Sequence, residues 1–528
     1  MDKKGRSGKW IIGLFWVLSV GFAAGIVALF MDKDTTGMIL FAAGLISVCP
    51  LLNRFYEKNN VLKKPIVRLA LAMCCYGVLF LPALNGNSAE GEANQPGVSG
   101  HGIKAHPRIL GYYNSPWPGE DGGPERLQVP YNLGGLDIKE DDEVLVTRRF
   151  THLANMMLLR DPGEVYLLTT ALARNRYLKL PAYSHVELVD PQTLKTIRRS
   201  VRLKAGPGWP GGFAIHRNGD IYVVFGRWCH RLDKDCNLLA SYRLPYNRSY
   251  NSLIILDNGY LAMKEMSETA SHLTVLDPET LRPVCDHIDL YEPSIARISG
   301  TGNTIYIVGT RSIFRYNWSE KVNRPVLDKD WIFDYVQNSG RSFGWDPVIE
   351  KNNAWFLDNG DHGYQIAMLG VARNPAQTHF VRVSLKDAAD TTVQAVSGLP
   401  EGTITNPPIF CENKNIFVAY DSANSVVKAY KYNPESREIS MIWEKEKFGA
   451  SNHMIYFPDT GELCTNDYKY GKGDASVILD VETGEEKGRT EMNNIFQGVI
   501  FSCPGWDRDY YYVTFDRIAR VYVRSMQR

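Results

Sequence analysis

A repeated strand–turn–strand pattern constrains the fold of this 528-residue chain more than any other feature. Past residue 150, short apolar runs alternate with turns built on Asn, Asp or Gly, as in GFAIHRNGDIYVVF and MIYFPDTGELCTN. A second hairpin turns on an Asp-Pro-x-Thr corner, as in VELVDPQTLKTIRR and LTVLDPETLRPVCD, where Asp and Pro favour a type I turn. The two hairpins recur together about every 45 residues, without a long amphipathic helix between them.

Two such hairpins make one four-stranded blade, so the repeat predicts an all-β propeller. We expect about eight blades, with seven as the alternative because the fifth repeat is long and irregular. The last repeat has room for only three strands, and residues 142–150 (DEVLVTRRF) are predicted to supply the fourth and close the ring. The predicted blades span 152–204, 206–244, 248–291, 292–335, 342–398, 402–448, 449–491 and 493–528.

The first 84 residues differ in character from the repeats and predict three transmembrane helices. Residues 10–30 are an uncharged apolar run long enough to span a bilayer, residues 37–52 are shorter and also uncharged, and residues 66–84 carry one arginine near an end. Basic residues precede the first span and follow the second, whereas the loop between them is acidic. This charge pattern places the N-terminus in the cytoplasm and the chain after Leu84 outside the membrane. The alternative is a buried helical hairpin of a soluble domain.

The chain therefore divides into three predicted parts. Residues 1–84 form the membrane domain, residues 85–123 are rich in Gly, Pro, Ser and Asn and predict a flexible linker, and residues 124–528 form the extracytoplasmic propeller. The expected partner of the first part is the lipid bilayer. A net charge of +1 and the lack of a basic tract in the body of the chain argue against nucleic-acid binding.

One position of the repeat is polar in nearly every blade. When the innermost strands are aligned on a shared Ile or Leu, seven of the eight residues three positions earlier are acids or amides. Innermost strands line the central channel, so these residues predict a ring at one mouth, where their oxygens could bind a hard cation such as Ca²⁺ or a polar ligand. The alternative is that Asn and Asp only start each strand by bonding to their own backbone. The eight residues are Asn155, Gly212, Asn251, Glu292, Asp346, Asn406, Asn452 and Gln497.

The candidate site residues come from this ring and from the loops beside it. Glu292 and Asp346 fall on adjacent predicted blades and are the candidate metal ligands, and Asp346 or His362 is the candidate catalytic base. Long loops in blades one, five and seven are expected on the same face, where function usually lies. The candidate ligand-binding residues are Asn155, Asn251, Asn406, Asn452, Gln497, Trp345 and His453.

Two enzyme families are similar in part. N-terminal spans followed by an eight-bladed propeller resemble the plan of membrane quinoprotein dehydrogenases, whose repeats carry a docking motif that ends in tryptophan. Only LDVETGEEKGR approaches this motif here, and Gly488 stands in place of the tryptophan. That family's adjacent cysteine pair also occurs here only as Cys74–Cys75, in the third span rather than in the propeller.

The second family is the gluconolactonase-like group, in which Glu, Asn, Asn and Asp at inner-strand starts hold one divalent metal. Glu292, Asn251, Asn406 and Asp346 are similar to that set in type and placement, although those enzymes are six-bladed and soluble. The resemblance implies a metal that activates water for attack on an ester or a lactone.

The favoured prediction is a non-enzymatic scaffold or binding module of the cell envelope, whose partner is an envelope protein or a polar small molecule. The alternatives are a metal-dependent hydrolase of the lactonase or esterase type and, less favoured, a quinoprotein-type dehydrogenase. Six cysteines lie outside the spans, which an oxidising compartment would allow to pair. Cys229 and Cys236 are the best candidates for a disulfide, with free thiols as the alternative.

Overall fold

The computed structural model describes residues 109–151, 154–170, 182–207, 211–337, 343–358, 376–402, 406–469, 472–493, 501–514 and 517–525. These residues belong to the compact unit Pro96–Arg528. The three predicted spans, residues 10–30, 37–52 and 66–84, lie outside the described residues. Within the described ranges, no helix has both the length and the apolar character needed to cross a membrane.

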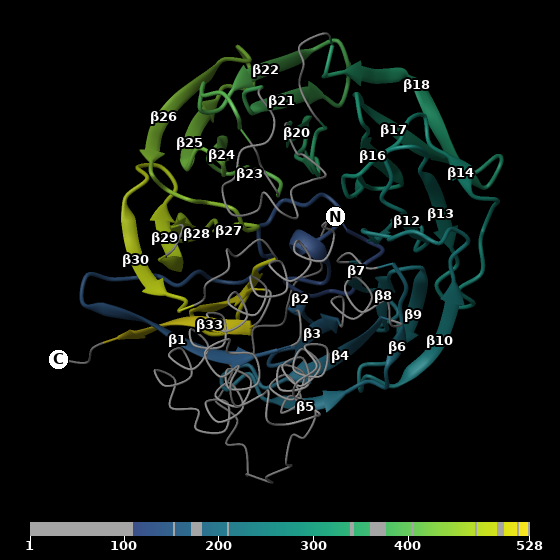
Figure 1. Ribbon diagram of the computed structural model, residues 1–528, viewed down its shortest axis with the longest axis horizontal. Coiled ribbons are helices and arrows are strands. Elements are labelled where there is room, and N and C mark those ends of the chain that lie inside the picture. The colour runs from purple at the N-terminus through teal and green to yellow at the C-terminus, as the bar shows by residue number, and fades with distance from the viewer. Residues whose placement is uncertain are drawn as a thin grey trace, which may run out of the picture. The chain divides into compact units, whose positions relative to one another are not determined.

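Eight antiparallel sheets surround a central channel in the described part of the chain, which confirms the predicted eight-bladed propeller (Figure 1). The innermost strands of blades one to eight are β2 (Ala154–Leu159), β7 (Gly212–Ile215), β11 (Ile254–Ile255), β15 (Ser299–Thr301), β19 (Val348–Ile349), β23 (Ile409–Cys411), β27 (Ile455–Phe457) and β31 (Cys503–Pro504). The second strands are β3 (Val165–Thr170), β8 (Ile221–Phe225), β12 (Leu261–Lys264), β16 (Thr304–Val308), β20 (Asn353–Leu357), β24 (Ile416–Asp421), β28 (Glu462–Lys469) and β32 (Asp509–Val513).

The outer half of each blade completes the sheet. The third strands are β4 (Tyr183–Val189), β9 (Trp228–Leu232), β13 (His272–Leu276), β17 (Ser312–Ser319), β21 (His379–Ser384), β25 (Val426–Tyr432), β29 (Gly473–Asp480) and β33 (Arg517–Ser525). The outermost strands are β5 (Thr196–Arg199) with the short β6 (Leu203–Lys204), β10 (Leu238–Arg243), β14 (Ile288–Asp289), β18 (Arg324–Asp334), β22 (Thr391–Ala395), β26 (Ile439–Glu446), β30 (Glu486–Glu491) and β1 (Asp142–Phe150).

The last blade closes with a strand from far earlier in the chain. Strand β1 pairs with β33 along nine residues, from Asp142 opposite Ser525 to Phe150 opposite Arg517. Figure 1 shows the blue β1 lying beside the yellow β33. The predicted closure by residues 142–150 is therefore confirmed. Because β1 covers the outer edge of β33, the N-terminal and C-terminal parts of the propeller hold one blade together.

Burial explains why these sequences form strands. Second strands such as β3 and β8 are runs buried throughout and rich in apolar residues, whereas outermost strands such as β1 and β10 consist of exposed and half-buried residues. At the Asp-Pro-x-Thr corners the aspartate accepts hydrogen bonds from the threonine N–H and hydroxyl three residues later, as Asp190 does from Thr193. The same bonds hold the turns at Asp277 and Asp480.

Part of the predicted linker differs from expectation. Residues 109–138, here called the channel plug, pass through the channel with the short 3₁₀ turn η3 (Glu120–Gly122) and then run over blade seven, where Ile138 lies near Gly488 of the outermost strand (Figure 1). Ile109, Tyr112 and Trp117 are 1–5% exposed, so residues 109–123 pack against the propeller instead of forming a free spacer. Three large apolar side chains anchor a segment whose Gly and Pro content alone indicates flexibility.

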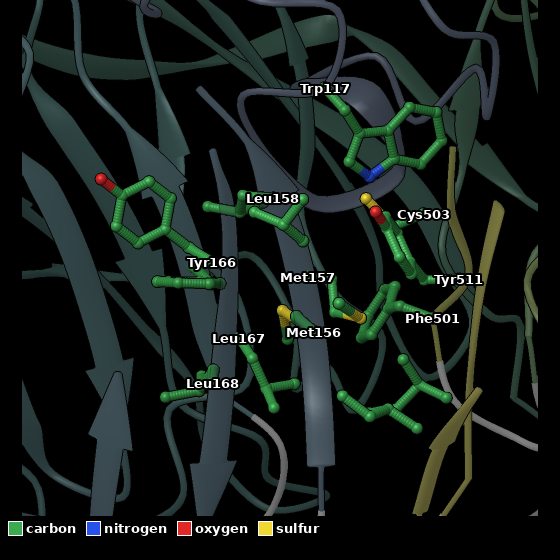
Figure 2. Packing of buried hydrophobic residues seen from close by; sticks show 14 of the residues in the cluster. Trp117, Met156, Met157, Leu158, Tyr166, Leu167, Leu168, Phe501, Cys503 and Tyr511 are labelled. Carbon is green, nitrogen blue, oxygen red and sulfur yellow. The ribbon is translucent and has the colours of Figure 1, made fainter. Parts of the chain in front are cut away.

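Trp117 belongs to a large hydrophobic cluster that joins the plug to blades one, two, seven and eight. Figure 2 shows its indole above the β2 side chains Met156, Met157 and Leu158, with Tyr511 of blade eight nearby. The first and last blades therefore share their core with the plug.

The predicted disulfide is not formed, because Cys229 and Cys236 are both free. Cys229 lies in β9 opposite Tyr242 and belongs to the cluster shared with blade three, whereas Cys236 lies in the β9–β10 turn and belongs to the cluster shared with blade one. The two thiols therefore point to opposite sides of their sheet. Burial raises the pKa of each thiol to about 12.

Candidate functional site: the channel network

The channel has two distinct faces. At the start face the innermost strands begin, and at the turn face they turn back into the second strands. The plug begins and ends at the turn face: Leu110 N–H donates to Asp257 Oδ1 over 3.1 Å, and Gly135 N–H donates to Asp459 over 3.1 Å. Both aspartates lie in turns between innermost and second strands. Between these points the plug carries its charged residues into the channel.

The sequence PGEDGGP lets the plug reverse direction inside the channel. Asp121 has φ 54°, and Gly122, with φ 86°, follows it in the left-handed region. A Cβ at Gly122 would lie 3.2 Å from the Trp117 ring, so glycine suits both the backbone and the close packing there. The reversal places Glu120 and Asp121 beside the charged groups of the channel wall.

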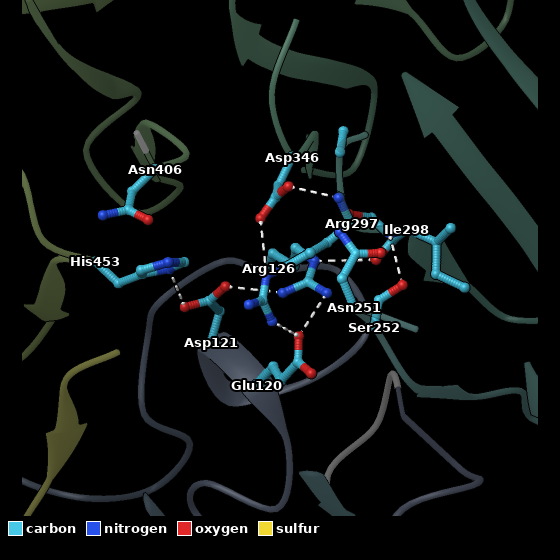
Figure 3. Close-up of polar contacts among 12 residues, drawn as sticks. Glu120, Asp121, Arg126, Asn251, Ser252, Arg297, Ile298, Asp346, Asn406 and His453 are labelled. Carbon is cyan, nitrogen blue, oxygen red and sulfur yellow. Dashed lines mark hydrogen bonds and ion pairs between the residues drawn. The ribbon is translucent and has the colours of Figure 1, made fainter. Parts of the chain in front are cut away.

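Arg126 of the plug holds both acids of the turn. Its Nη2 lies 2.8 Å from Glu120 Oε2, its Nη1 lies 3.0 Å from Asp121 Oδ2, and its Nε donates to the Ile298 carbonyl over 3.0 Å (Figure 3). The side chains of this ion-paired trio are 1–2% exposed. Low exposure makes these interactions strong and makes the loss of one partner costly.

Arg297 of blade four links the plug to blade five. Its Nη1 lies 3.1 Å from Glu120 Oε2, its Nε lies 3.7 Å from Asp346 Oδ2, and its backbone N–H donates to Asp346 Oδ1 over 2.6 Å. Figure 3 shows the two arginines between the acids of the plug and Asp346. Asp346 therefore faces a guanidinium group.

His453 of blade seven completes the network on the opposite side. Its Nδ1 lies 2.7 Å from Asp121 Oδ1 (Figure 3). The Phe501 ring lies between two groups of this network, with the His453 ring centroid at 4.0 Å and the Arg297 guanidinium at 4.5 Å. We call Glu120, Asp121, Arg126, Arg297, Asp346 and His453 the channel network.

Burial and ion pairing shift the pKa values of the two acids of the plug in opposite directions. Burial is the largest influence on Glu120 and raises its pKa, although Arg126 and Arg297 oppose the rise. Burial alone would also raise the pKa of Asp121, but His453 and Arg126 together hold it below its usual value. The plug thus carries one acid whose pKa lies above its usual value and one whose pKa lies below it.

Lys264, at the end of β12, is a fully buried amine beside the network. Its Nζ lies 3.2 Å from the Ser294 carbonyl and 3.4 Å from Asn251 Oδ1. Burial lowers the pKa of Lys264 to about 7, because Glu265 and Asp346 compensate only part of the desolvation. Lys264 therefore titrates near neutral pH.

The polar ring residues connect neighbouring blades. Asn251 of blade three donates to the Ile295 carbonyl of blade four over 2.8 Å, and Asn406 of blade six donates to the Ser451 carbonyl of blade seven. Asn452 of blade seven donates to Ser502 Oγ of blade eight over 3.0 Å. An amide at this position thus bonds to the next blade in chain order. This contact gives a physical reason for repeating the residue type from blade to blade.

Glu292 stands apart from the channel network. Its Oε1 accepts from Arg311 N–H over 3.3 Å and from Ser312 N–H over 2.5 Å, at the start of β17. The residue beside Asp346 is Arg297 instead. In the ranges that the structure describes, no three His, Cys, Asp or Glu side chains are grouped so that they could hold a metal ion. The contacts seen for Asp346 and Glu292 are therefore with positive or N–H groups.

The remaining candidates divide between buried and undescribed positions. Trp345 is 6% exposed and packs in the cluster of blades five, six and seven. Asn155 lies in β2, and His362 and Gln497 fall outside the described residues. Sequence reasoning missed Glu120, Asp121, Arg126, Arg297 and Lys264. The only signal for the first three was the presence of charged residues inside a Gly- and Pro-rich segment.

Comparisons with known proteins assign no family and no function to this chain. No protein-family model matches the sequence, and no curated protein matches it. The WD40 repeats of RRP9 are 8% identical, with a TM-score of 0.43, and the match covers 73% of this chain and 99% of that chain. The β-propeller domain of Myceliophteria thermophila Cps50 (Swd1) is 10% identical, with a TM-score of 0.40 and coverage of 62% and 99%. Kuenenia stuttgartiensis hydrazine synthase is 10% identical, with a TM-score of 0.39 and coverage of 60% and 93%.

Proposed function

We propose that this protein is a membrane-anchored, extracytoplasmic β-propeller that acts as a non-enzymatic binding scaffold of the cell envelope. The main support for the proposal is the filled channel: the plug occupies it, and its buried acids contact Arg297 and His453. A channel filled in this way leaves binding to the outer surfaces and loops of a rigid scaffold.

The hydrolase alternative gains no support from the contacts. It needs Glu292 and Asp346 to converge on one metal ion, but Glu292 bonds to backbone N–H groups of β17 and Asp346 faces Arg297. A guanidinium beside a carboxylate supplies the positive charge that a metal would otherwise bring. The ring amides already bond to neighbouring blades, which supports a structural use of that position.

Metal analysis of the full-length chain, purified in detergent without chelators, tests the choice between scaffold and hydrolase. We expect less than one tenth of an equivalent of Ca, Mg, Mn or Zn, and no change on Asp346→Asn. An equivalent of metal that disappears in Asp346→Asn would overturn the proposal in favour of the hydrolase.

Amine cross-linking in native membranes tests the scaffold role directly. We expect discrete high-mass species that contain this chain and a second protein, which mass spectrometry identifies. If the chain stays alone over the full range of cross-linker concentration, the scaffold role is wrong.

The proposed anchor is residues 10–30, 37–52 and 66–84, with the N-terminus in the cytoplasm. Single cysteines introduced by Ser7→Cys and Ser99→Cys, in a Cys285→Ser background, test this topology in intact cells. A membrane-impermeant maleimide is expected to label the cysteine at 99 and to label the one at 7 only after the membrane is opened. Equal labelling of both in intact cells would contradict the topology.

A further inference from the structure

A groove at the outer rim lies between blades three and four. It has a volume of about 580 Å³, and we call it the rim groove. Strands β14 and β18, which border it, lie side by side at the circumference in Figure 1. The residues that line the rim groove are Ile288, Asp289, Tyr291, Tyr316, Val322, Arg324, Pro325, Val326 and Leu327.

Three of the apolar side chains that line the rim groove are exposed. Tyr291 is 52% exposed, Val322 is 53% exposed and Val326 is 45% exposed. Exposed apolar side chains that are scattered singly need no explanation, but three that gather in one concave surface indicate an interaction site. An apolar side chain of a partner would bury all three.

Two opposite charges at the rim groove favour one orientation of a bound ligand. The Arg324 guanidinium is exposed and makes no ion pair or hydrogen bond within the described residues. Asp289, whose side chain is 90% exposed, lies on the blade-three side with His272 Nε2 at 3.4 Å from its Oδ1. A carboxylate of a ligand would be attracted to Arg324 and repelled by Asp289.

The backbone beside the rim groove also leaves room for an extended segment. Strand β14 has only two residues, Ile288 and Asp289, and its inner side pairs with β13. No further strand of the described chain pairs with its outer side. An extended peptide can therefore lie along β14 and place alternate side chains into the rim groove.

We propose that the rim groove binds a short extended peptide of a partner protein, in which a bulky apolar side chain stands next to a carboxylate. The apolar side chain packs among Tyr291, Val322 and Val326, and the carboxylate pairs with Arg324. This inference rests on the binding role proposed above and identifies one surface that serves it.

The test uses the full-length chain in detergent and a phage library of random hexapeptides. Peptides are selected against the native chain and measured by fluorescence anisotropy against Val326→Asp and Arg324→Glu. The matched controls are Met441→Asp, which changes an exposed apolar residue on the outermost strand of blade six, and Arg243→Glu, which reverses an exposed charge on β10. All four positions are exposed, and unchanged thermal unfolding confirms that each variant is folded.

We expect selected peptides to carry an aromatic or large aliphatic residue within two positions of Asp or Glu. Their affinity should fall at least tenfold in Val326→Asp and Arg324→Glu and stay within twofold in both controls. The proposal is overturned if no such sequence is enriched, if the selected peptides bind Val326→Asp normally, or if Val326→Asp only dissociates a dimer of this chain. If the cross-linked partner persists in Val326→Asp, the scaffold role stands and the rim groove is not its site.

Discussion

The channel plug and the closing strand are consecutive in sequence, and both complete the propeller, but they do so by different chemistry. Strand β1 pairs with β33 through a continuous nine-residue backbone ladder. The plug makes single backbone hydrogen bonds to several blades, such as that of Ile215 N–H with the Pro118 carbonyl, and adds buried ion pairs in which Arg126 and Arg297 lie between the acids. A continuous backbone ladder tolerates many side chains, whereas the plug depends in addition on a few particular ones.

The largest expected effect comes from removing the central cation of the plug. Arg126→Met leaves Glu120 and Asp121 buried without the guanidinium that contacts both of them. We expect the free energy of unfolding to fall by about 3–5 kcal/mol, measured by urea denaturation of the full-length chain followed by tryptophan fluorescence.

A matched double variant separates lost charge pairing from lost packing. Glu120→Gln in the Arg126→Met background removes one of the stranded acids, so part of the stability should return. A loss of less than about 1 kcal/mol for Arg126→Met would contradict the assigned role of the buried ion pairs.

Lys264 is a buried amine that forms no ion pair within the described residues. Its removal should therefore change stability in the opposite direction to the removal of Arg126. The pKa of Lys264 in the folded chain is about 7, below its usual value of 10.5, so the unfolded chain binds the proton more tightly between these values. The desolvation penalty is complete below pH 7, and stability should rise with pH through the window by up to about 1.4 kcal/mol per pH unit.

Replacement by an apolar side chain removes this penalty. We expect Lys264→Met to raise the free energy of unfolding by about 2 kcal/mol at pH 7, and the difference from the native chain to shrink towards pH 9. Urea denaturation at pH 6, 7, 8 and 9 measures this slope. Lys195→Met, at an exposed position, is the control and should follow the native chain at every pH. A difference that is constant with pH would show that Lys264 does not titrate in this window.

The same contrast explains what could be predicted from the sequence. The blades and the closure by β1 follow from alternating burial, turn residues and an incomplete last repeat, which are local patterns. The plug could not be predicted in this way, because Trp117, Glu120 and Arg126 acquire partners only when eight distant strands surround them. Their segment contains the glycines and prolines of a linker, and its composition gives no sign of those partners.

The predicted ring residues of blades three, six and seven are amides that bond to the next blade, whereas the alignment was displaced in blade four. The Gly300 N–H donates to the Pro124 carbonyl of the plug over 2.7 Å, just as the Ile349 N–H donates to the Glu125 carbonyl over 2.8 Å. Gly300 thus occupies the position where the alignment used an isoleucine, and a Cβ there would lie 2.8 Å from the Ile254 side chain. An alignment based on isoleucine therefore selected Glu292, while Arg297 takes the place beside Asp346.

A side chain in the closing strand should matter less than one in the plug. Val146 is partly buried against the cluster that Trp117 shares with blades one and eight, and it lies opposite Val521 in the ladder. We expect Val146→Ala to cost about 1 kcal/mol, which is the value of the apolar surface lost. Hydrogen exchange of the β33 amides should stay within tenfold of native, because the ladder does not depend on this side chain. Loss of protection along the whole of β33 would show that closure depends on side chains as the plug does.

The smallest effect is expected for the ion pair of the closing strand, which has the same chemistry as the pair in the plug but the opposite exposure. Arg524 Nη2 lies 2.6 Å from Glu143 Oε2, and the two side chains are 62% and 48% exposed. Water and salt weaken such a pair, so Arg524→Ala should change the free energy of unfolding by less than about 1 kcal/mol. In 0.5 M NaCl this difference should vanish, whereas the cost of Arg126→Met should persist because salt screens buried charges poorly. If the two variants lose stability equally and respond equally to salt, burial is not what separates the plug from the closing strand.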